Sequence, residues 1–217
     1  RPFKRTYAES YFGDYSGEVP EFESHPYLNA VQYRRSAQGQ ITVITKKPGF
    51  MVCKNCGYAE RRDQVEEDHT HNNPSIYDVE CPNKFLYQFD LGHQYLTDVV
   101  EIQIQEISYD EALATLYALV AAAPSVGIIK SDLDGNLRPN KAIVIYDKVP
   151  GGAGHVQRFV DELQEIMETA LSIVSNCECS RDTSCYGCIR SFNNQHFHDS
   201  LARGHAVDVL TSVLDNV

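Results

Sequence analysis

Four cysteines crowd into a short stretch near the C-terminus, in the order Cys177-x-Cys179-x5-Cys185-x2-Cys188. A segment of this kind has little apolar surface to bury, so a metal ion or disulfide bonds must hold its fold. Four thiolates this close in sequence can surround one tetrahedral zinc ion, with Zn–S distances of about 2.3 Å. The choice between zinc and disulfides therefore decides what kind of protein this chain can form.

The cysteine count and the N-terminal sequence favour zinc. The chain has seven cysteines, an odd number, and its Arg-Pro-Phe-Lys-Arg start is not followed by the apolar segment of a secretory signal. Disulfide frameworks belong to secreted chains with paired cysteines. A site closed by four thiolates leaves no position for water, so it is structural rather than catalytic. The alternative, a redox dithiol of Cys185 and Cys188, leaves the other two cysteines unexplained.

A second set of cysteines lies in a polar part of the chain. Cys53 and Cys56 form a Cys-x2-Cys-Gly turn that looks like half of a zinc ribbon, and Cys81 follows later. A fourth ligand is missing from the cysteine count. His69 and His71 are the nearest candidates, and we predict His71 because it lies closer to Cys81. The sequence thus predicts one Zn²⁺ and allows a second. The alternative is a loop with three free thiols, which would be open to oxidation.

Hydrophobic patterning predicts an α+β fold with a mixed or antiparallel sheet, packed helices and zinc-stapled cysteine modules. Alternating and β-branched residues predict strands within residues 27–52, 84–107, 126–131 and 142–146. Turns are predicted at residues 38–40 and at Asp134-Gly135-Asn136. Apolar residues at helical spacing predict helices over residues 109–123, 156–174 and about 198–214.

The domain organisation follows from where this patterning begins. Residues 1–25 have no clear period and are predicted to be an extended lead-in, and residues 26–217 are predicted to form one zinc-binding α+β domain. Within it, residues 53–81 would be a zinc-ribbon-like insert and residues 177–188 a four-cysteine knuckle. Because the chain begins without Met, we expect it to be part of a larger protein.

The charge balance limits the partners. The chain has 19 Lys+Arg against 30 Asp+Glu, a formal net charge of −11. Proteins that bind nucleic acid strongly usually carry a basic excess, because neutralising phosphates supplies most of their affinity. We therefore expect DNA binding to be weak at most. No run of about 20 apolar residues occurs, so no membrane partner is expected and the predicted location is cytoplasmic.

No catalytic motif is legible in the sequence. The glycine turn at residues 150–154 lacks GxGxxG spacing, and no GxxxxGK[ST] phosphate loop occurs. This turn could bind an anion at the following helix start, or its glycines could serve close packing. His93, His155, His196 and His198 show no spacing typical of a catalytic set. The chain by itself is therefore predicted not to be an enzyme.

Several motifs taken together resemble a known family. They are Leu91-Gly-His-Gln-Tyr-Leu-Thr-Asp98, Tyr146-Asp-Lys-Val-Pro-Gly-Gly-Ala-Gly154, the cysteine knuckle with its continuation to His198, and Leu201-Ala-Arg203. This set is similar to the MrfA-type zinc-binding domain. That domain lies at the C-terminal end of certain superfamily 2 DEAD/DEAH-box helicases and also occurs in relatives of helicase-associated phage-defence proteins. The resemblance covers about residues 50 to 215.

The resemblance implies that Cys177, Cys179, Cys185 and Cys188 correspond to the zinc ligands of the family. The family often has Leu-Asp-Arg where this chain has Leu-Ala-Arg, which would weaken any salt link made from Ala202. The implied function is a non-catalytic, structural zinc-binding accessory domain of a DNA helicase or a helicase-linked defence protein, in DNA repair or phage defence.

Such a domain would pack against the helicase motor domains and help to shape the path of a DNA strand. Two alternatives stand beside this interpretation. The first is an acidic protein-interaction or scaffold module that never contacts nucleic acid. The second is a hydrolase that uses His155 or His198 near the glycine turn.

Overall fold

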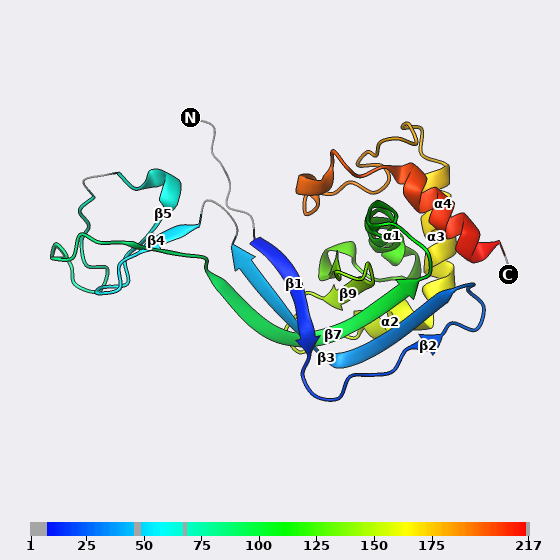
Figure 1. The fold of residues 1–217 in the computed structure, drawn as a ribbon, viewed down its shortest axis with the longest axis horizontal. Coiled ribbons are helices and arrows are strands. Elements are labelled where there is room, and N and C mark those ends of the chain that lie inside the picture. Colours follow the sequence, from blue (N-terminus) through cyan, green and yellow to red (C-terminus); the bar gives the residue numbers. More distant parts are fainter. Residues whose placement is uncertain (1–7, 46–48, 67–68, 216–217) are drawn as a thin grey trace. The chain divides into compact units, whose positions relative to one another are not determined.

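The structure, a computed structural model, describes residues 8–45, 49–66 and 69–215 (Figure 1). Its strands are β1 (Ala8–Tyr15), β2 (Glu23–Ser24), β3 (Val31–Thr45), β4 (Phe50–Val52), β5 (Ala59–Arg61), β6 (Tyr87–Phe89), β7 (Gly92–Ile104), β8 (Leu133–Leu137) and β9 (Ile143–Asp147). Its α-helices are α1 (Tyr109–Ala122), α2 (His155–Asp161), α3 (Leu163–Ser175) and α4 (Arg203–Leu214). The predicted α+β fold class is confirmed.

The chain divides into two compact units. The insert unit holds the described residues of 1–11 and 42–94, and the helical unit holds 12–41 and 95–215. The insert unit contains a three-stranded sheet in the order β5-β4-β6. The domain boundary predicted after residue 25 stays a prediction. No helix in the described part of the chain combines the length and the apolar character needed to cross a membrane.

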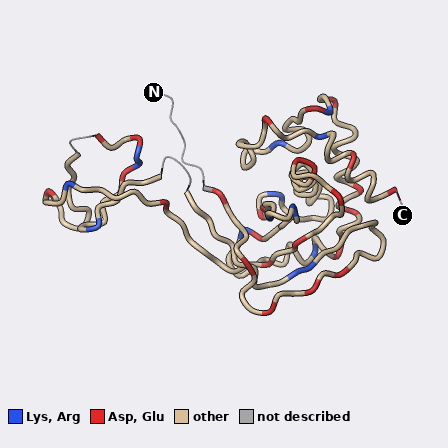
Figure 2. Tube along the Cα trace, in the orientation of Figure 1, with Lys and Arg blue, Asp and Glu red and all other residues tan. Residues whose placement is uncertain are grey.

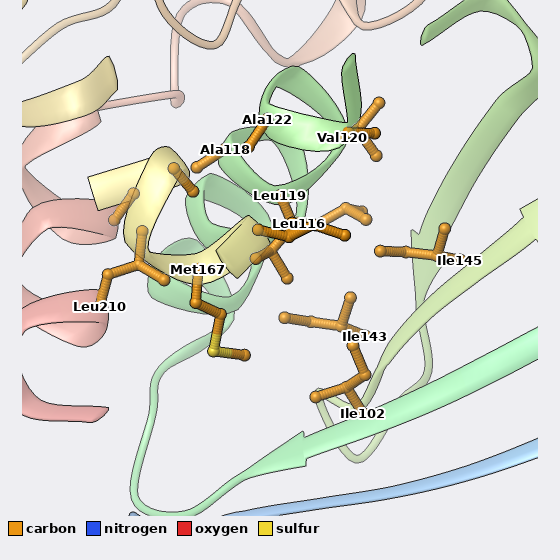
Figure 3. Packing of buried hydrophobic residues seen from close by; sticks show 14 of the residues in the cluster. Ile102, Leu116, Ala118, Leu119, Val120, Ala122, Ile143, Ile145, Met167 and Leu210 are labelled. Atoms are coloured by element: carbon orange, nitrogen blue, oxygen red, sulfur yellow. The ribbon is translucent and has the colours of Figure 1, made fainter. Parts of the chain in front are cut away.

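The larger sheet has the order β1-β3-β7-β9-β8, with β2 paired to β3. The β7–β9 and β8–β9 pairs are antiparallel, with Ile102 opposite Ile143 and Gly135 opposite Ile145. Since alternate residues of a strand face opposite sides, Ile102, Ile143 and Ile145 present one apolar face to the helices. Figure 3 shows these side chains directed toward Leu116 of α1 and Met167 of α3.

The helices build the main core. α1 contacts β8, β9, α3 and α4, and α3 also contacts α4. α1 begins at a capping box, in which the Ser108 hydroxyl accepts the Glu111 N–H at 3.3 Å and the Glu111 carboxylate accepts the Ser108 N–H at 2.7 Å. The helix predicted over residues 109–123 is therefore present as α1, and both α3 and α4 pack against it.

Other predicted boundaries were wrong. The long helix predicted over residues 156–174 is two helices, because the backbone leaves the helical region at Glu162, where φ is −112°. The apolar stripe continues through both helices, so the spacing did not reveal this break. The last helix begins at Arg203 rather than near residue 198. The segment 126–131, predicted as a strand, contains parts of two 3-10 turns instead.

Two glycines predicted to make turns lie inside strands. A Cβ on Gly39 in β3 would lie 2.2 Å from Val99 Cγ1, and one on Gly135 in β8 would lie 2.5 Å from Leu116 Cδ1. Glycine is needed at both places because another side chain approaches the backbone closely. The hairpin turn between β8 and β9 instead lies at residues 138–142, where Lys141 has a φ of 70°.

Candidate metal centres

The four C-terminal cysteines, here called the C-terminal tetrad, come together with the geometry of one metal site. Cys177 Sγ lies 3.5 Å from Cys179 Sγ and 3.4 Å from Cys185 Sγ, and Cys188 Sγ lies 3.9 Å from those of Cys179 and Cys185. A tetrahedral zinc–thiolate site has sulfur–sulfur edges of about 3.8 Å. A disulfide would need about 2.05 Å, and all seven cysteines are free. The donor set therefore fits Zn²⁺.

Local backbone structure presents the sulfurs to the site. Cys177 and Cys179 directly follow α3, and the Cys185–Cys188 turn is closed by the Cys188 N–H bonding to the Cys185 carbonyl at 3.1 Å. The Cys185 N–H donates to Cys188 Sγ at 3.2 Å. A hydrogen bond from the Cys179 backbone lowers the pKa of Cys177 to about 7, whereas burial raises the pKa of Cys188 to about 12. Metal binding would displace protons from such thiols.

Arg203, the first residue of α4, ties this tetrad to the helices. Its guanidinium donates to the Val174 carbonyl at 2.7 Å and twice to the Cys179 carbonyl, at 2.8 and 2.7 Å. The Arg203 side chain thus satisfies the Val174 carbonyl in the last turn of α3, which has no helical partner, and binds the Cys179 carbonyl within the tetrad. The sequence showed Arg203 only as part of a motif. Because it binds carbonyl groups, it needs no acidic partner at Ala202.

The segment after the knuckle is held by a second arginine. Arg190 donates to Ser184 Oγ at 3.0 Å and to the His198 carbonyl at 2.9 Å. The His198 ring nitrogen Nε2 lies 3.1 Å from the Ser191 carbonyl and 3.0 Å from Oδ1 of the fully buried Asn194. His198 is therefore held within a hydrogen-bonded loop. These contacts support a structural role for His198 rather than a hydrolytic one.

The glycine turn before α2 encloses the chain's own carboxylates. Asp147, which is fully buried, accepts N–H groups of Ala153 at 2.6 Å, His155 at 3.2 Å and Val156 at 3.0 Å. Asp98 accepts the Gly154 N–H at 3.2 Å. An anion favoured at a helix start is therefore already present as Asp147. The sequence displayed Asp147 in the Tyr-Asp-Lys motif but could not show that it folds back onto this helix.

The second set of ligand atoms, here called the insert tetrad, is Cys53, Cys56, His71 and Cys81. Cys53 Sγ lies 3.9 Å from Cys81 Sγ, and Cys56 Sγ lies 3.3 Å from His71 Nε2. In each tetrad all ligand atoms lie within 4.8 Å of one another. With Zn–S of about 2.3 Å and Zn–N of about 2.0 Å, a sulfur–nitrogen edge of about 3.5 Å is expected. The two tetrads thus fit one or two zinc ions.

His71, and not His69, lies among these donors. The His69 ring stacks on that of His71 with centroids 5.2 Å apart, and the Tyr58 ring stacks on His71 at 4.5 Å. Two asparagine side chains donate to the thiols: Asn55 to Cys81 and Asn83 to Cys53, each at 3.5 Å. Nothing in the sequence indicated these amides, since asparagines are common in loops. Stacking and amide contacts together orient the donors.

Comparison with known proteins supports the zinc interpretation for the helical unit. Residues 115–189 match the family described as the MrfA Zn-binding domain. This stretch is shorter than the residues 50 to 215 predicted from motifs, and it includes the whole C-terminal tetrad and no residue of the insert tetrad.

Two longer proteins are similar to the chain. The Druantia protein DruE of Escherichia coli (strain UMEA 4076-1) is 26% identical over 200 residues, covering 76% of this chain and 11% of DruE. The crystal structure of the DUF1998 helicase MrfA bound to DNA matches with a TM-score of 0.54 at 13% identity, covering 96% of this chain and 25% of that one. The MrfA likeness shows a shared fold. The chain thus spans only a small part of either protein.

Proposed function

We propose, starting from the match of residues 115–189 to the MrfA Zn-binding domain, that this chain is a structural zinc-binding accessory domain of a helicase or a helicase-linked defence protein. The observation that carries the proposal is the C-terminal tetrad, whose sulfur spacing matches one zinc ion exactly where α3 ends and α4 is anchored by Arg203. Zinc there would set the relative orientation of α3 and α4 rather than perform chemistry.

A closed thiolate site contributes through folding energy. Zinc would bind the four deprotonated sulfurs and supply no open coordination position for a substrate. Cys177 and Cys179 would fix the end of α3, and Cys185 and Cys188 would fix the turn that leads to the Arg190-held loop. We likewise propose that the insert tetrad holds a second zinc ion.

The proposed role of the parent protein follows from the relatives. MrfA is a DNA-bound helicase and DruE is a Druantia protein, so we propose a parent that acts in the cytoplasm in DNA repair or phage defence. In it, this domain would pack against the motor domains and help to shape the path of a DNA strand. The net charge is −11, and Figure 2 shows acidic residues spread along the trace. This charge supports a domain that guides a DNA strand rather than one that binds it tightly.

A second function has one specific observation in its favour. A groove of about 670 Å³ in the helical unit is lined by Tyr27, Tyr33, Glu162 and Glu165, among others. Acidic and aromatic side chains of this kind suit a basic segment of a protein partner. A scaffold module of this type would contact no DNA. A titration of the intact chain with DNA at low salt separates the two functions, because only strand guidance requires salt-sensitive binding.

Elemental analysis of protein purified without added metal tests the zinc proposal. Two zinc ions per chain would support both tetrads as sites. If one zinc ion per chain is found, the zinc content of the Cys185→Ser variant is measured next. This variant loses the zinc ion only if the C-terminal tetrad is the site. No zinc in a folded protein would overturn the proposed function.

A further inference from the structure

Aromatic side chains line up along the outer strand of the insert unit. Tyr87 and Phe89 in β6 are 46% and 41% exposed, and Phe85, which lies two residues before Tyr87 and outside the strand, is 76% exposed. β6 pairs on one side with β4 and ends the order β5-β4-β6. Exposed rings that lie next to one another mark an interaction site, whereas singly scattered ones are ordinary.

The insert tetrad places a lysine over this row. Lys54 follows Cys53 in the metal-binding turn, and its ammonium lies 4.0 Å from the centroid of the Tyr87 ring and 5.8 Å from that of Phe89. Contact of one ammonium with both rings shows that Tyr87 and Phe89 share a face. Lys84, which is exposed, directly precedes Phe85. The row therefore has one ammonium over its middle ring and a second, exposed lysine next to Phe85 in the sequence.

We propose that Phe85, Tyr87 and Phe89, with Lys54 and Lys84, form a stacking surface for single-stranded nucleic acid. Tyr87 and Phe89 are alternate residues of β6 and so lie about 6.7 Å apart, roughly twice the 3.4 Å rise per nucleotide of one duplex strand. The rings thus suit an extended, unstacked strand. Stacking on aromatic rings accepts any base, and adjacent lysines take up phosphates.

The contact of Lys54 with Tyr87 explains how the surface remains available. A cation–π contact at an exposed site is weak, so a base can replace the ammonium on the Tyr87 ring. The displaced ammonium then pairs with a backbone phosphate, and both groups keep a partner. A purely apolar protein partner would instead have to leave this cation without one, which disfavours that occupant.

This inference deepens the proposed function, because it names the part of the chain that a DNA strand would touch. It rests on residues of the insert unit alone, whereas the structural zinc role rests on the C-terminal tetrad. The two can therefore fail separately.

The test is binding of a fluorescent oligothymidylate of about 12 nucleotides, within the range of single-strand sites, to the intact zinc-loaded chain at low salt. The variant Phe85→Ala/Tyr87→Ala/Phe89→Ala should bind at least about 100-fold more weakly, since each stacked base is worth about 5- to 150-fold. The matched control removes three exposed aromatic rings elsewhere, by Tyr27→Ala/Tyr77→Ala/Tyr109→Ala, and should bind as the unmodified chain does.

Two further variants sharpen the result. Exchanging the rings, as in Phe85→Tyr/Tyr87→Phe/Phe89→Tyr, should preserve binding because stacking is kept. Lys54→Gln/Lys84→Gln should reduce the slope of log affinity against log salt by about 1.4, the value for two phosphates on a single strand.

Three outcomes would overturn the proposal. One is an unmodified chain that does not bind the oligonucleotide, which would point to a protein partner. Another is an alanine variant with full zinc content that binds unchanged, which would place DNA binding elsewhere and leave the zinc role intact. Should the alanine variant lose zinc, photocrosslinking of the unmodified chain to iododeoxyuridine DNA decides. Crosslinks within residues 85–89 support the proposal, and crosslinks confined elsewhere overturn it.

Discussion

The two cysteine tetrads have similar donor spacing but very different surroundings. The C-terminal tetrad packs against a large apolar core, which includes Cys188 itself and the neighbouring Ile189 and Leu201. In the insert unit, the buried residues among those described in 42–94 are Gly49, Cys53, His71 and Cys81. Three of these four belong to the insert tetrad. Metal would therefore complete a core in the helical unit and would itself be the core of the insert unit.

This difference has an energetic meaning. A three-stranded sheet with short strands buries too little apolar surface to be stable alone, so its folding free energy must come from ligand–metal bonds. The helical unit has hydrophobic burial of its own, contributing about 25 cal/mol per Å² of apolar surface. We therefore expect the two units to respond differently when metal or single contacts are removed.

The largest difference should follow removal of metal from both tetrads with a chelator. The insert unit should unfold, so that protease cleavage within residues 50–90 accelerates by more than about tenfold, a change of about 1.4 kcal/mol or more in opening free energy. The helices should retain most of their far-UV circular dichroism. Limited proteolysis with mass spectrometry measures the cleavage in each unit. Equal protection of both units after metal removal would contradict the expected difference between them.

Cys185→Ser should have the next largest effect, because it removes a zinc ligand between α3 and α4. We expect the loss of one zinc ion and of about 3 kcal/mol or more of stability, which lowers the melting temperature by roughly 6–12 °C. Glu178 is exposed and lies between two of the ligands in the sequence. The matched control Glu178→Gln should change neither the zinc content nor the melting temperature. Full zinc content with unchanged melting in Cys185→Ser would contradict the structural role.

Arg203→Ala tests whether the helical unit is held by more than metal. Three charge-assisted hydrogen bonds to the Val174 and Cys179 carbonyls are lost, so we expect a loss of about 2–4 kcal/mol in chemical denaturation while zinc is retained. Arg181→Ala removes an exposed ion pair with Asp208 and should cost less than about 1 kcal/mol. Similar losses in both variants would show that the Arg203 contacts add nothing special.

His71→Ala should have the smallest effect on the stability of the helical unit, below about 1 kcal/mol, while removing one zinc ion from the insert tetrad. The His69→Ala variant should keep that zinc ion, because the ring of His69 stacks on His71 and contributes no donor atom to the insert tetrad. Zinc analysis combined with hydrogen exchange of the helices measures both quantities. Retention of two zinc ions in His71→Ala would remove His71 from the site.

Features that depend on neighbouring residues were predictable from the sequence. The Cys-x2-Cys turns are local, since each closes through hydrogen bonds between residues three or four apart. The α1 helix was predictable for the same reason, because its apolar period and its acidic start lie within one short segment. The fold class followed from such segments, taken in order along the chain.

Features that depend on contacts between distant residues required the tertiary structure. Gly39 and Gly135 looked like turn residues because nothing nearby in sequence shows that Val99 and Leu116 approach them. The sequence favoured His71 only by its nearness to Cys81, and the 3.3 Å approach of its Nε2 to Cys56 Sγ is a tertiary contact. Arg203 acts on carbonyl groups 24 and 29 residues away. Residue types and their spacing in the sequence indicate which ligand a site can bind. Close contacts between side chains and backbone, and the choice of hydrogen-bond partners, arise only when separate segments pack together.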